Sequence, residues 1–124
     1  MNDLFLKLVN YLSEYNINMK ENYELYRNLQ EKNPITRKSK KIIEENITFH
    51  IFSPKKYKTN KIIIYLHGGG WTIGSVKHYS FTLANLANEL KRHIVTFDYP
   101  LAPEHPFPEG LKYCYQGVKT IFKN

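Results

Sequence analysis

The first third of the chain carries apolar side chains at helical spacing. A first helix is predicted within residues 1–16, where one face collects Leu4, Leu8, Tyr11, Leu12 and Tyr15. A second helix is predicted to begin at Asn18, with Glu21 spaced as a capping box requires, and to end at Asn33-Pro34. Its apolar face consists of Met19, Tyr23, Tyr26 and Leu29.

Strand-like and helical patterns alternate in the remainder of the chain. After a basic linker, Ile47–Phe52 alternates in a way that predicts a strand. The apolar runs Ile62–Leu66 and Ile94–Phe97 show no alternation, which is typical of strands covered on both faces. One helix is predicted from Tyr79, Leu83, Leu86, Ala87 and Leu90. A last helix is predicted to open at Pro108, with an inner face of Leu111, Cys114, Tyr115, Val118 and Ile121.

The order of these elements indicates the fold class. From Ile47 onward it is strand, strand, helix, strand, helix, and a strand–helix–strand unit with buried strands implies parallel pairing through a right-handed crossover. We therefore predict an α/β fold with mainly parallel strands flanked by helices. Residues 1–40 form a helical N-terminal part, and residues 41–124 form the sheet domain.

Composition narrows the function classes. The net charge is +7, but the lysines are scattered and no recognised nucleic-acid-binding motif accompanies them, so nucleic-acid binding is the weakest hypothesis. Two clusters flank predicted strands: Lys38, Lys40 and Lys41, and Lys55, Lys56, Lys58 and Lys61. No stretch reaches the ~18 apolar residues of a membrane span, and the N-terminus lacks a signal-peptide pattern, so a cytoplasmic protein is expected. The single cysteine, Cys114, is expected to be a small buried residue.

The most informative segment is His67-Gly68-Gly69-Gly70-Trp71, directly after a predicted buried strand. Successive glycines cost conformational entropy, so a fold keeps them where side chains do not fit or φ must be positive. At the carboxyl end of a parallel strand, their N–H groups can point at a ligand's negative charge. A phosphate site is disfavoured because neither GxxxxGK[ST] nor GxGxxG spacing occurs. An oxyanion on an acyl carbon fits, and a simple tight turn is the plain alternative.

A second motif, Asp98-Tyr99-Pro100-Leu101-Ala102-Pro103-Glu104-His105-Pro106-Phe107-Pro108, follows the next predicted strand. Together, HGGGW and DYxLAPEHPFP closely resemble the hormone-sensitive-lipase branch of the α/β hydrolases, which includes arylacetamide deacetylase-like esterases. The spacing and the intervening strand–helix–strand match that family too. The resemblance covers roughly residue 47 to the C-terminus. It covers more weakly the N-terminal helices, which in this family form part of a cap over the acyl pocket.

The resemblance implies a role for each residue of the glycine loop. Gly69 and Gly70 would donate N–H groups to the oxyanion, and Gly68 would shape the turn. His67 would brace the loop rather than act as the base, which in this family lies near the end of the chain. Trp71 would line the pocket.

The resemblance also implies roles and departures in the second motif. Glu104 and His105 would form a buried, hydrogen-bonded brace for the loop. Family members usually have Arg where this chain has Pro100, and an acidic residue near Tyr113. Losing that Arg removes planar, multi-donor bracing that Pro cannot supply. No cofactor is implied, and the histidines lack the close spacing of metal ligands: His50, His67, His78, His93 and His105.

The family's nucleophile is a Ser in a GxSxG elbow, followed much later by Asp and His. No GxSxG occurs in the 124 residues, so we expect no catalytic residue of the triad here and no activity from the chain alone. One hypothesis is a truncated or split esterase acting on a small-molecule carboxylic ester, completed by a downstream polypeptide that carries GxSxG. The others are a non-catalytic module that binds an acyl or anionic ligand and, more weakly, a nucleic-acid binder.

Overall fold

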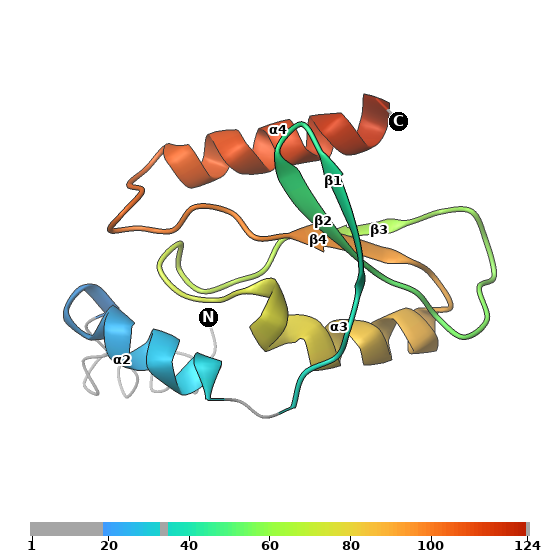
Figure 1. Ribbon diagram of the computed structural model, residues 1–124, viewed down its shortest axis with the longest axis horizontal. Coiled ribbons are helices and arrows are strands. Elements are labelled where there is room, and N and C mark those ends of the chain that lie inside the picture. The colour runs from blue at the N-terminus through green and yellow to red at the C-terminus, as the bar shows by residue number, and fades with distance from the viewer. Residues whose placement is uncertain (1–18, 33–34, 124) are drawn as a thin grey trace, which may run out of the picture.

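The computed structural model describes residues 19–32 and 35–123, so the helix predicted from Leu4 to Tyr15 lies outside the described residues. The described elements are, in chain order, α2 (Met19–Glu31), β1 (Lys40–Glu44), β2 (Ile47–Phe52), β3 (Ile63–Tyr65), α3 (Val76–Leu90), β4 (Ile94–Phe97) and α4 (Glu109–Lys123) (Figure 1). The predicted strands and helices therefore appear within one to three residues of their expected bounds.

The four strands form one sheet in the order β1-β2-β4-β3. Helix α3 connects β3 to β4, and these two strands pair directly in parallel. β2 is antiparallel to both of its neighbours, β1 and β4. The α/β class is confirmed. This part of the sheet is mixed rather than mainly parallel, because β2 runs antiparallel both to its hairpin partner β1 and to β4.

The sequence pattern does not predict this hairpin, because β1 lies in the basic stretch before the strand predicted at Ile47–Phe52. Lys40–Glu44 pairs with Ile47–Phe52, and the two-residue turn Glu45-Asn46 has φ values of 48° and 63°. Positive φ at both central residues is the geometry that matches the twist of a hairpin. Since all five residues of β1 are exposed, the strand has no buried face to create an alternating pattern.

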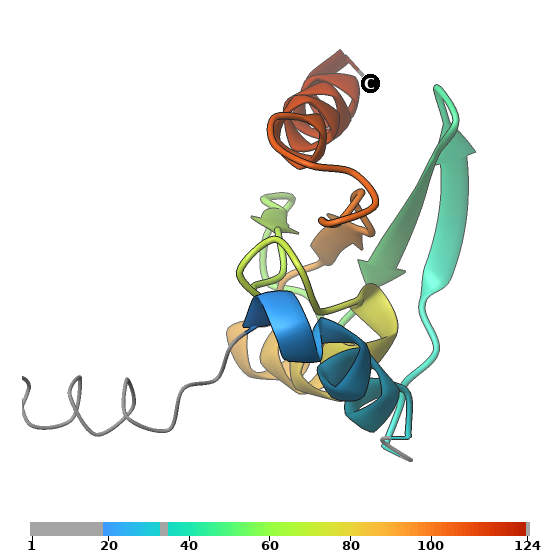
Figure 2. The ribbon, with the colours of Figure 1, turned by 90° about the vertical axis from the view of Figure 1, so that its left-hand side faces the viewer.

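Helices cover both faces of the sheet, α4 on one side and α3 on the other (Figures 1 and 2). Successive residues of a strand point to opposite faces. Ile94 accordingly packs in the cluster under α3, while Val95 and Phe97 pack in the cluster under α4. The rings of Phe49 and Phe97 meet edge to face, with centroids 5.4 Å apart.

Helix α4 keeps part of the predicted inner face, because Cys114 is buried and Ile121 packs against the core. Leu111 and Tyr115, expected to be inside, are 50% and 66% exposed. The buried positions are Gly110, Cys114, Gly117 and Thr120. The physical reason is close approach, since a Cβ on Gly117 would overlap the ring of Phe97, so small residues define the inner face.

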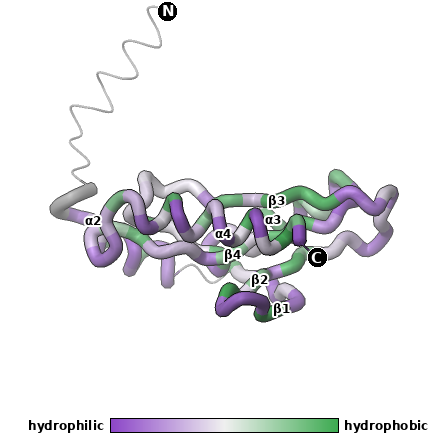
Figure 3. The backbone as a smooth tube through the Cα atoms, turned by 90° about the horizontal axis from the view of Figure 1, so that it is seen from above, coloured by the Kyte–Doolittle hydropathy of each residue, from purple (hydrophilic) through white to green (hydrophobic). Residues whose placement is uncertain are grey.

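Two further expectations differ in detail. Leu29, placed on the inner face of the second helix, is 56% exposed. β3, expected to be covered on both faces, is half-buried, with Ile62 and Leu66 exposed on either side of it. β3 is an edge strand of the described sheet, and its hydrophobic residues lie along this edge (Figure 3). No described helix has the length and apolar character needed to cross a membrane.

Candidate functional site

The loop between β3 and α3 carries the three glycines and is held by its carbonyl groups. The hydroxyl of Tyr99 donates to the carbonyl of His67. The Nδ1–H of His67 donates to the carbonyl of Gly68 at 2.9 Å. The carbonyl of Gly69 accepts from the N–H groups three and four positions later, at 3.1 and 3.0 Å. Three consecutive carbonyl groups are therefore fixed in direction.

The glycine N–H groups take their directions from these carbonyls. A trans peptide unit is planar, and its N–H points opposite to its C=O. Anchoring the carbonyls of residues 67–69 therefore turns the N–H groups of Gly68, Gly69 and Gly70 away from the anchoring groups. None of these three N–H groups donates to an acceptor in the described chain. Within that part of the protein, three successive backbone donors remain available to a ligand.

Glycine is required at Gly69 for two reasons. Its φ is 136°, and a Cβ there would overlap the backbone carbonyl of Ile73. Gly70 has a φ of 60°, and no atom lies within 4 Å of the place where its Cβ would be. The turn therefore depends sterically on Gly69, whereas Gly70 faces open space.

His67 is buried and stacks on Tyr99, with ring centroids 4.3 Å apart. Because a carbonyl can only accept, Nδ1 carries the proton of the bond to Gly68. Nε2 lies 4.0 Å from Oδ1 of Asp98 and has no hydrogen-bond partner among the described residues. Burial raises the pKa of Tyr99 to about 12, so its hydroxyl stays protonated and keeps donating to the loop.

A cavity of about 310 Å³ lies against this loop. It is lined by Leu66, His67, Gly68, Gly69, Gly70, Trp71, Tyr99 and Cys114. Trp71 is 51% exposed and lies edge-on to Tyr99. Cys114 is buried, as predicted, and burial raises the pKa of its thiol, which keeps it in the unreactive protonated form.

The second motif contacts the glycine loop and the start of α3. Oδ1 of Asp98 accepts from the N–H of Val76 at 2.8 Å, which satisfies a donor of the first helical turn. The N–H of Ala102 donates to the carbonyl of Trp71, also at 2.8 Å. The second motif thus holds the C-terminal part of the loop, from the carbonyl of Trp71 to the N–H of Val76.

The expected burial of Glu104 and His105 is wrong. Their side chains are 50% and 54% exposed, in a turn where charged groups keep their water. Glu104 pairs with Arg27 of α2, with Nη1 and Oε1 2.6 Å apart, and His105 pairs with Glu109 at 2.8 Å. Glu104 reaches the loop through Arg27. Among the described residues, His105 hydrogen-bonds to Glu109 and to the carbonyl of Leu101, and not to the glycine loop.

Arg27 is the site residue that the sequence analysis missed. Its Nε donates to the carbonyl of Thr72 at 2.9 Å, and its Nη2 donates to the carbonyl of Ala102 at 2.8 Å. The one available signal was scarcity, since fifteen of the eighteen cationic residues are lysine. Arginine is the cation suited to planar, multi-donor contacts.

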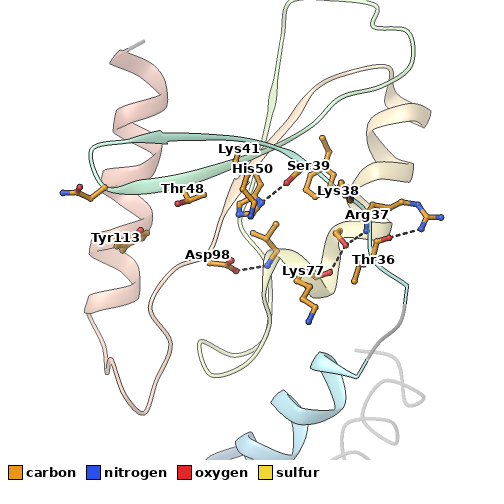
Figure 4. A pocket seen from close by; sticks show the side chains of 14 residues that line it. Thr36, Arg37, Lys38, Ser39, Lys41, Thr48, His50, Lys77, Asp98 and Tyr113 are labelled. Atoms are coloured by element: carbon orange, nitrogen blue, oxygen red, sulfur yellow. Dashed lines mark hydrogen bonds between the residues drawn. The ribbon is translucent and has the colours of Figure 1, made fainter.

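A second cavity, of about 840 Å³, lies between the β1–β2 hairpin, the start of α3 and Asp98 (Figure 4). Within it, Ser39 Oγ and His50 Nδ1 are 2.8 Å apart. Burial lowers the pKa of His50, and Lys41 acts in the same direction while Asp98 opposes it. A hydroxyl beside a neutral imidazole is a nucleophile–base pair in principle. However, no residue of 67–71 lines this cavity.

Residues 63–124, half of the chain, match the family described as the alpha/beta hydrolase fold. The chain belongs to this family. The match covers β3, the glycine loop, α3, β4, the proline-rich segment and α4. No group of three histidine, cysteine or acidic side chains suited to a metal ion occurs among the residues that the structure describes.

Several curated relatives of this alpha/beta hydrolase chain are named as esterases. An arylesterase of Saccharolobus solfataricus is 31% identical over 78 residues, which are 63% of this chain and 26% of the relative. The arylacetamide deacetylase of Mus musculus is 31% identical over 110 residues, which are 83% of this chain and 28% of the relative. The chain therefore spans little more than a quarter of the length of these proteins. The resemblance to the hormone-sensitive-lipase branch is confirmed.

Solved structures show the same fold. A crystal structure of EstE5 has a TM-score of 0.72 at 22% identity, with 82% of this chain and 36% of that chain covered. An esterase from the bacterial hormone-sensitive lipase family has a TM-score of 0.67 at 21% identity, with 85% and 36% covered. At this level of identity the likeness concerns the fold alone.

Proposed function

We propose that these 124 residues contribute the oxyanion-binding loop of a carboxylic-ester hydrolase. The substrate is a small-molecule carboxylic ester, which a serine attacks to give an acyl-enzyme that water then hydrolyses. The N–H groups of Gly69 and Gly70 donate to the oxygen that becomes negatively charged during attack, and Gly68 shapes the turn. The supporting observation is that the carbonyls of His67, Gly68 and Gly69 are anchored while the glycine N–H groups are unpaired in the described chain.

The nucleophile, acid and base of this reaction lie on a segment outside these residues, because the 124 residues contain no GxSxG. The arylesterase and carboxylesterase among the relatives support an ester as the substrate class. α2 belongs to a cap beside the acyl pocket, and His67, Trp71 and Glu104 support the loop. A cytoplasmic location is part of this proposal.

A second candidate is a module that binds an acyl or anionic ligand without catalysis. The cavity of about 310 Å³ beside the glycine loop favours it, because the unpaired glycine N–H groups adjoin a space that Trp71, Tyr99 and Cys114 also line. In that case the same N–H groups would hold a stable carboxylate instead of a transient oxyanion.

Complementation distinguishes these functions. The chain is purified alone and after co-expression with a polypeptide that carries the GxSxG strand and the remainder of a related esterase. Hydrolysis of a short-chain nitrophenyl ester and labelling by a fluorophosphonate are then measured. We expect neither from the chain alone, and both from the complex, with the label on the elbow serine.

Two results would contradict the proposal. One is stoichiometric labelling of a serine in this chain, for which Ser39→Ala is the control because Ser39 contacts His50. The other is a stable complex that hydrolyses no ester, combined with amide shifts of residues 68–70 when acetate or butyrate is added to the chain alone. That outcome would favour the binding module.

A further inference from the structure

Helix α2 makes several hydrogen bonds to the loop that carries the glycines and to the proline-rich segment. The guanidinium of Arg27 donates to the carbonyls of Thr72 and Ala102 and to both carboxylate oxygens of Glu104. One turn further along the helix, the amide oxygen of Gln30 accepts from the N–H of Gly74 at 2.9 Å. One helix thus contacts the backbone of two loops that are far apart in the sequence.

The contact with Thr72 is transmitted to the glycines through planar peptide units. The carbonyl of Thr72 shares a peptide unit with the N–H of Ile73, and that N–H donates to the carbonyl of Gly69. Fixing the carbonyl of Thr72 therefore fixes the direction of the N–H of Ile73. The carbonyl of Gly69 in turn shares a unit with the N–H of Gly70. The guanidinium of Arg27 is two peptide units away from an N–H that the proposed function assigns to the oxyanion.

A parallel connection runs through the proline-rich segment. Arg27 holds the carbonyl of Ala102, and the N–H of Ala102 holds the carbonyl of Trp71. The carbonyl of Trp71 shares a peptide unit with the N–H of Thr72, which is the second donor to Gly69. Both N–H groups that anchor the carbonyl of Gly69 are therefore connected to the same guanidinium.

We infer that Arg27 is a positioning residue that sets the geometry of the oxyanion loop from helix α2. The inference rests on the proposed function of the loop. Arg27 does not touch the substrate; it orients the peptide units that orient the N–H of Gly70. Release of α2 would leave the carbonyl of Gly69, and hence the donor of Gly70, free to rotate.

The chemistry of the contact requires arginine in particular. Four hydrogen bonds diverge in one plane to two carbonyls and a carboxylate, and an ammonium group is a point charge that cannot meet them together. The side chains of Arg27 and Glu104 are 28% and 50% exposed, so salt screens their attraction, and the ion pair alone would contribute little. The two carbonyl contacts carry the positioning.

The test needs no substrate and no nucleophile, so it is independent of esterase activity. Trp71 is the only tryptophan of the chain and lies inside the loop, so its fluorescence reports on the loop directly. Arg27→Ala should make Trp71 more accessible to acrylamide. It should also speed hydrogen exchange at the N–H groups of Thr72 and Ile73 by about tenfold, the scale of one lost hydrogen bond. Amides of α3 and α4 should keep their protection.

Three comparisons make this test specific. Arg27→Lys should protect the N–H groups of Thr72 and Ile73 little better than Arg27→Ala does. Free guanidinium, far below denaturing concentrations, should restore much of this protection to Arg27→Ala. Sodium at equal ionic strength should not. Arg37→Ala is the matched control, because that guanidinium donates to the carbonyl of Thr36 and stacks on Phe81 instead. Glu104→Gln keeps Arg27 and should loosen the loop less than Arg27→Ala.

Two outcomes would overturn the inference. One is that Arg27→Ala leaves the exchange of the loop and the accessibility of Trp71 equal to those of Arg37→Ala. The other is that exchange rises equally over the loop, α3 and α4, which would show that Arg27 supports only global stability. Neither outcome bears on whether Gly70 binds an oxyanion, so the proposed function is tested separately.

Discussion

Gly69 and Gly70 are adjacent glycines at positive φ, yet the surroundings treat them differently. A side chain on Gly69 would overlap backbone atoms of Ile73, which no rotamer change can relieve. A side chain on Gly70 would extend into open space, so only the left-handed backbone would resist it. Gly69 is therefore needed for the shape of the loop, whereas Gly70 faces open space.

Alanine substitutions measure this difference. Gly70→Ala should lower the free energy of unfolding by about 1–2 kcal/mol, the usual cost of a left-handed non-glycine residue. Gly69→Ala should cost more than roughly 3 kcal/mol, because steric overlap with the backbone adds to the strained φ. Urea unfolding followed by the fluorescence of Trp71 gives both values. Equal losses would show that the turn does not have the described geometry.

The sequence predicted the glycine loop and the proline-rich segment because each is contiguous and chemically distinctive. Arg27 was not predictable in the same way. Its contacts with Thr72 and Ala102 join positions 45 and 75 residues apart, and no local pattern encodes a pairing of that range. The wrong expectation of burial for Glu104 has the same cause. Its partner Arg27 was not predicted, and a carboxylate paired with a partly exposed guanidinium does not need burial.

At the scale of elements, helix α4 shows where a periodic pattern misleads. The expected face was chosen by hydrophobicity, but Leu111 and Tyr115 are exposed and Gly110 and Gly117 are buried. Glycine adds nothing to a hydrophobic pattern. Where a helix packs closely on a sheet through glycines, the pattern therefore does not reveal which face is buried. β1 was missed for a related reason, because a fully exposed strand shows no burial pattern.

Glu45 connects the β1–β2 turn to α4 and gives the chain a defined acid sensitivity. Its carboxylate accepts from Thr120, Lys123 and Gln116, and these hydrogen bonds lower its pKa from 4.5 to about 2. A lowered pKa in the folded state means that the contribution to stability is complete above pH 4.5 and is lost as the pH falls through 2.

Glu45→Gln should therefore be less stable than the wild type near neutral pH, and the difference should shrink between pH 4.5 and pH 2. Urea unfolding at a series of pH values tests this. Glu44→Gln is the control, because the neighbouring carboxylate makes none of these contacts in the described chain. A wild-type advantage that persists unchanged at pH 2 would contradict the contacts of Glu45.

At the scale of the whole molecule, the two edges of the described sheet differ. β1 carries charges at Lys40, Lys41 and Glu44, which discourage pairing with another chain. β3 has none, and Ile62 and Leu66 beside it are exposed. An apolar edge with unpaired backbone groups is a template for association.

We expect the 124-residue chain to self-associate through β3 despite its net charge of +7. Ile62→Lys should shift the protein toward the monomer in sedimentation velocity, because it places a charge on this edge. Ile43→Lys, on the already charged β1 edge, should have little effect. If the wild-type chain sediments as a monomer and unfolds sharply, β3 is not an adhesive edge and the binding-module hypothesis gains support.

The proposed donation by Gly70 is tested most directly by removing its N–H without adding a side chain. Glycolic acid in place of Gly70 converts the amide to an ester, which deletes that donor and also weakens the carbonyl of Gly69 as an acceptor from Thr72 and Ile73. Normal folding and labelling of the complex therefore serve as the control for the shape of the loop. In the complex with a GxSxG-bearing polypeptide, turnover of a nitrophenyl ester should fall by about 10²–10³, the usual scale for one lost oxyanion donor. Unchanged turnover in a complex that folds and labels normally would contradict the account.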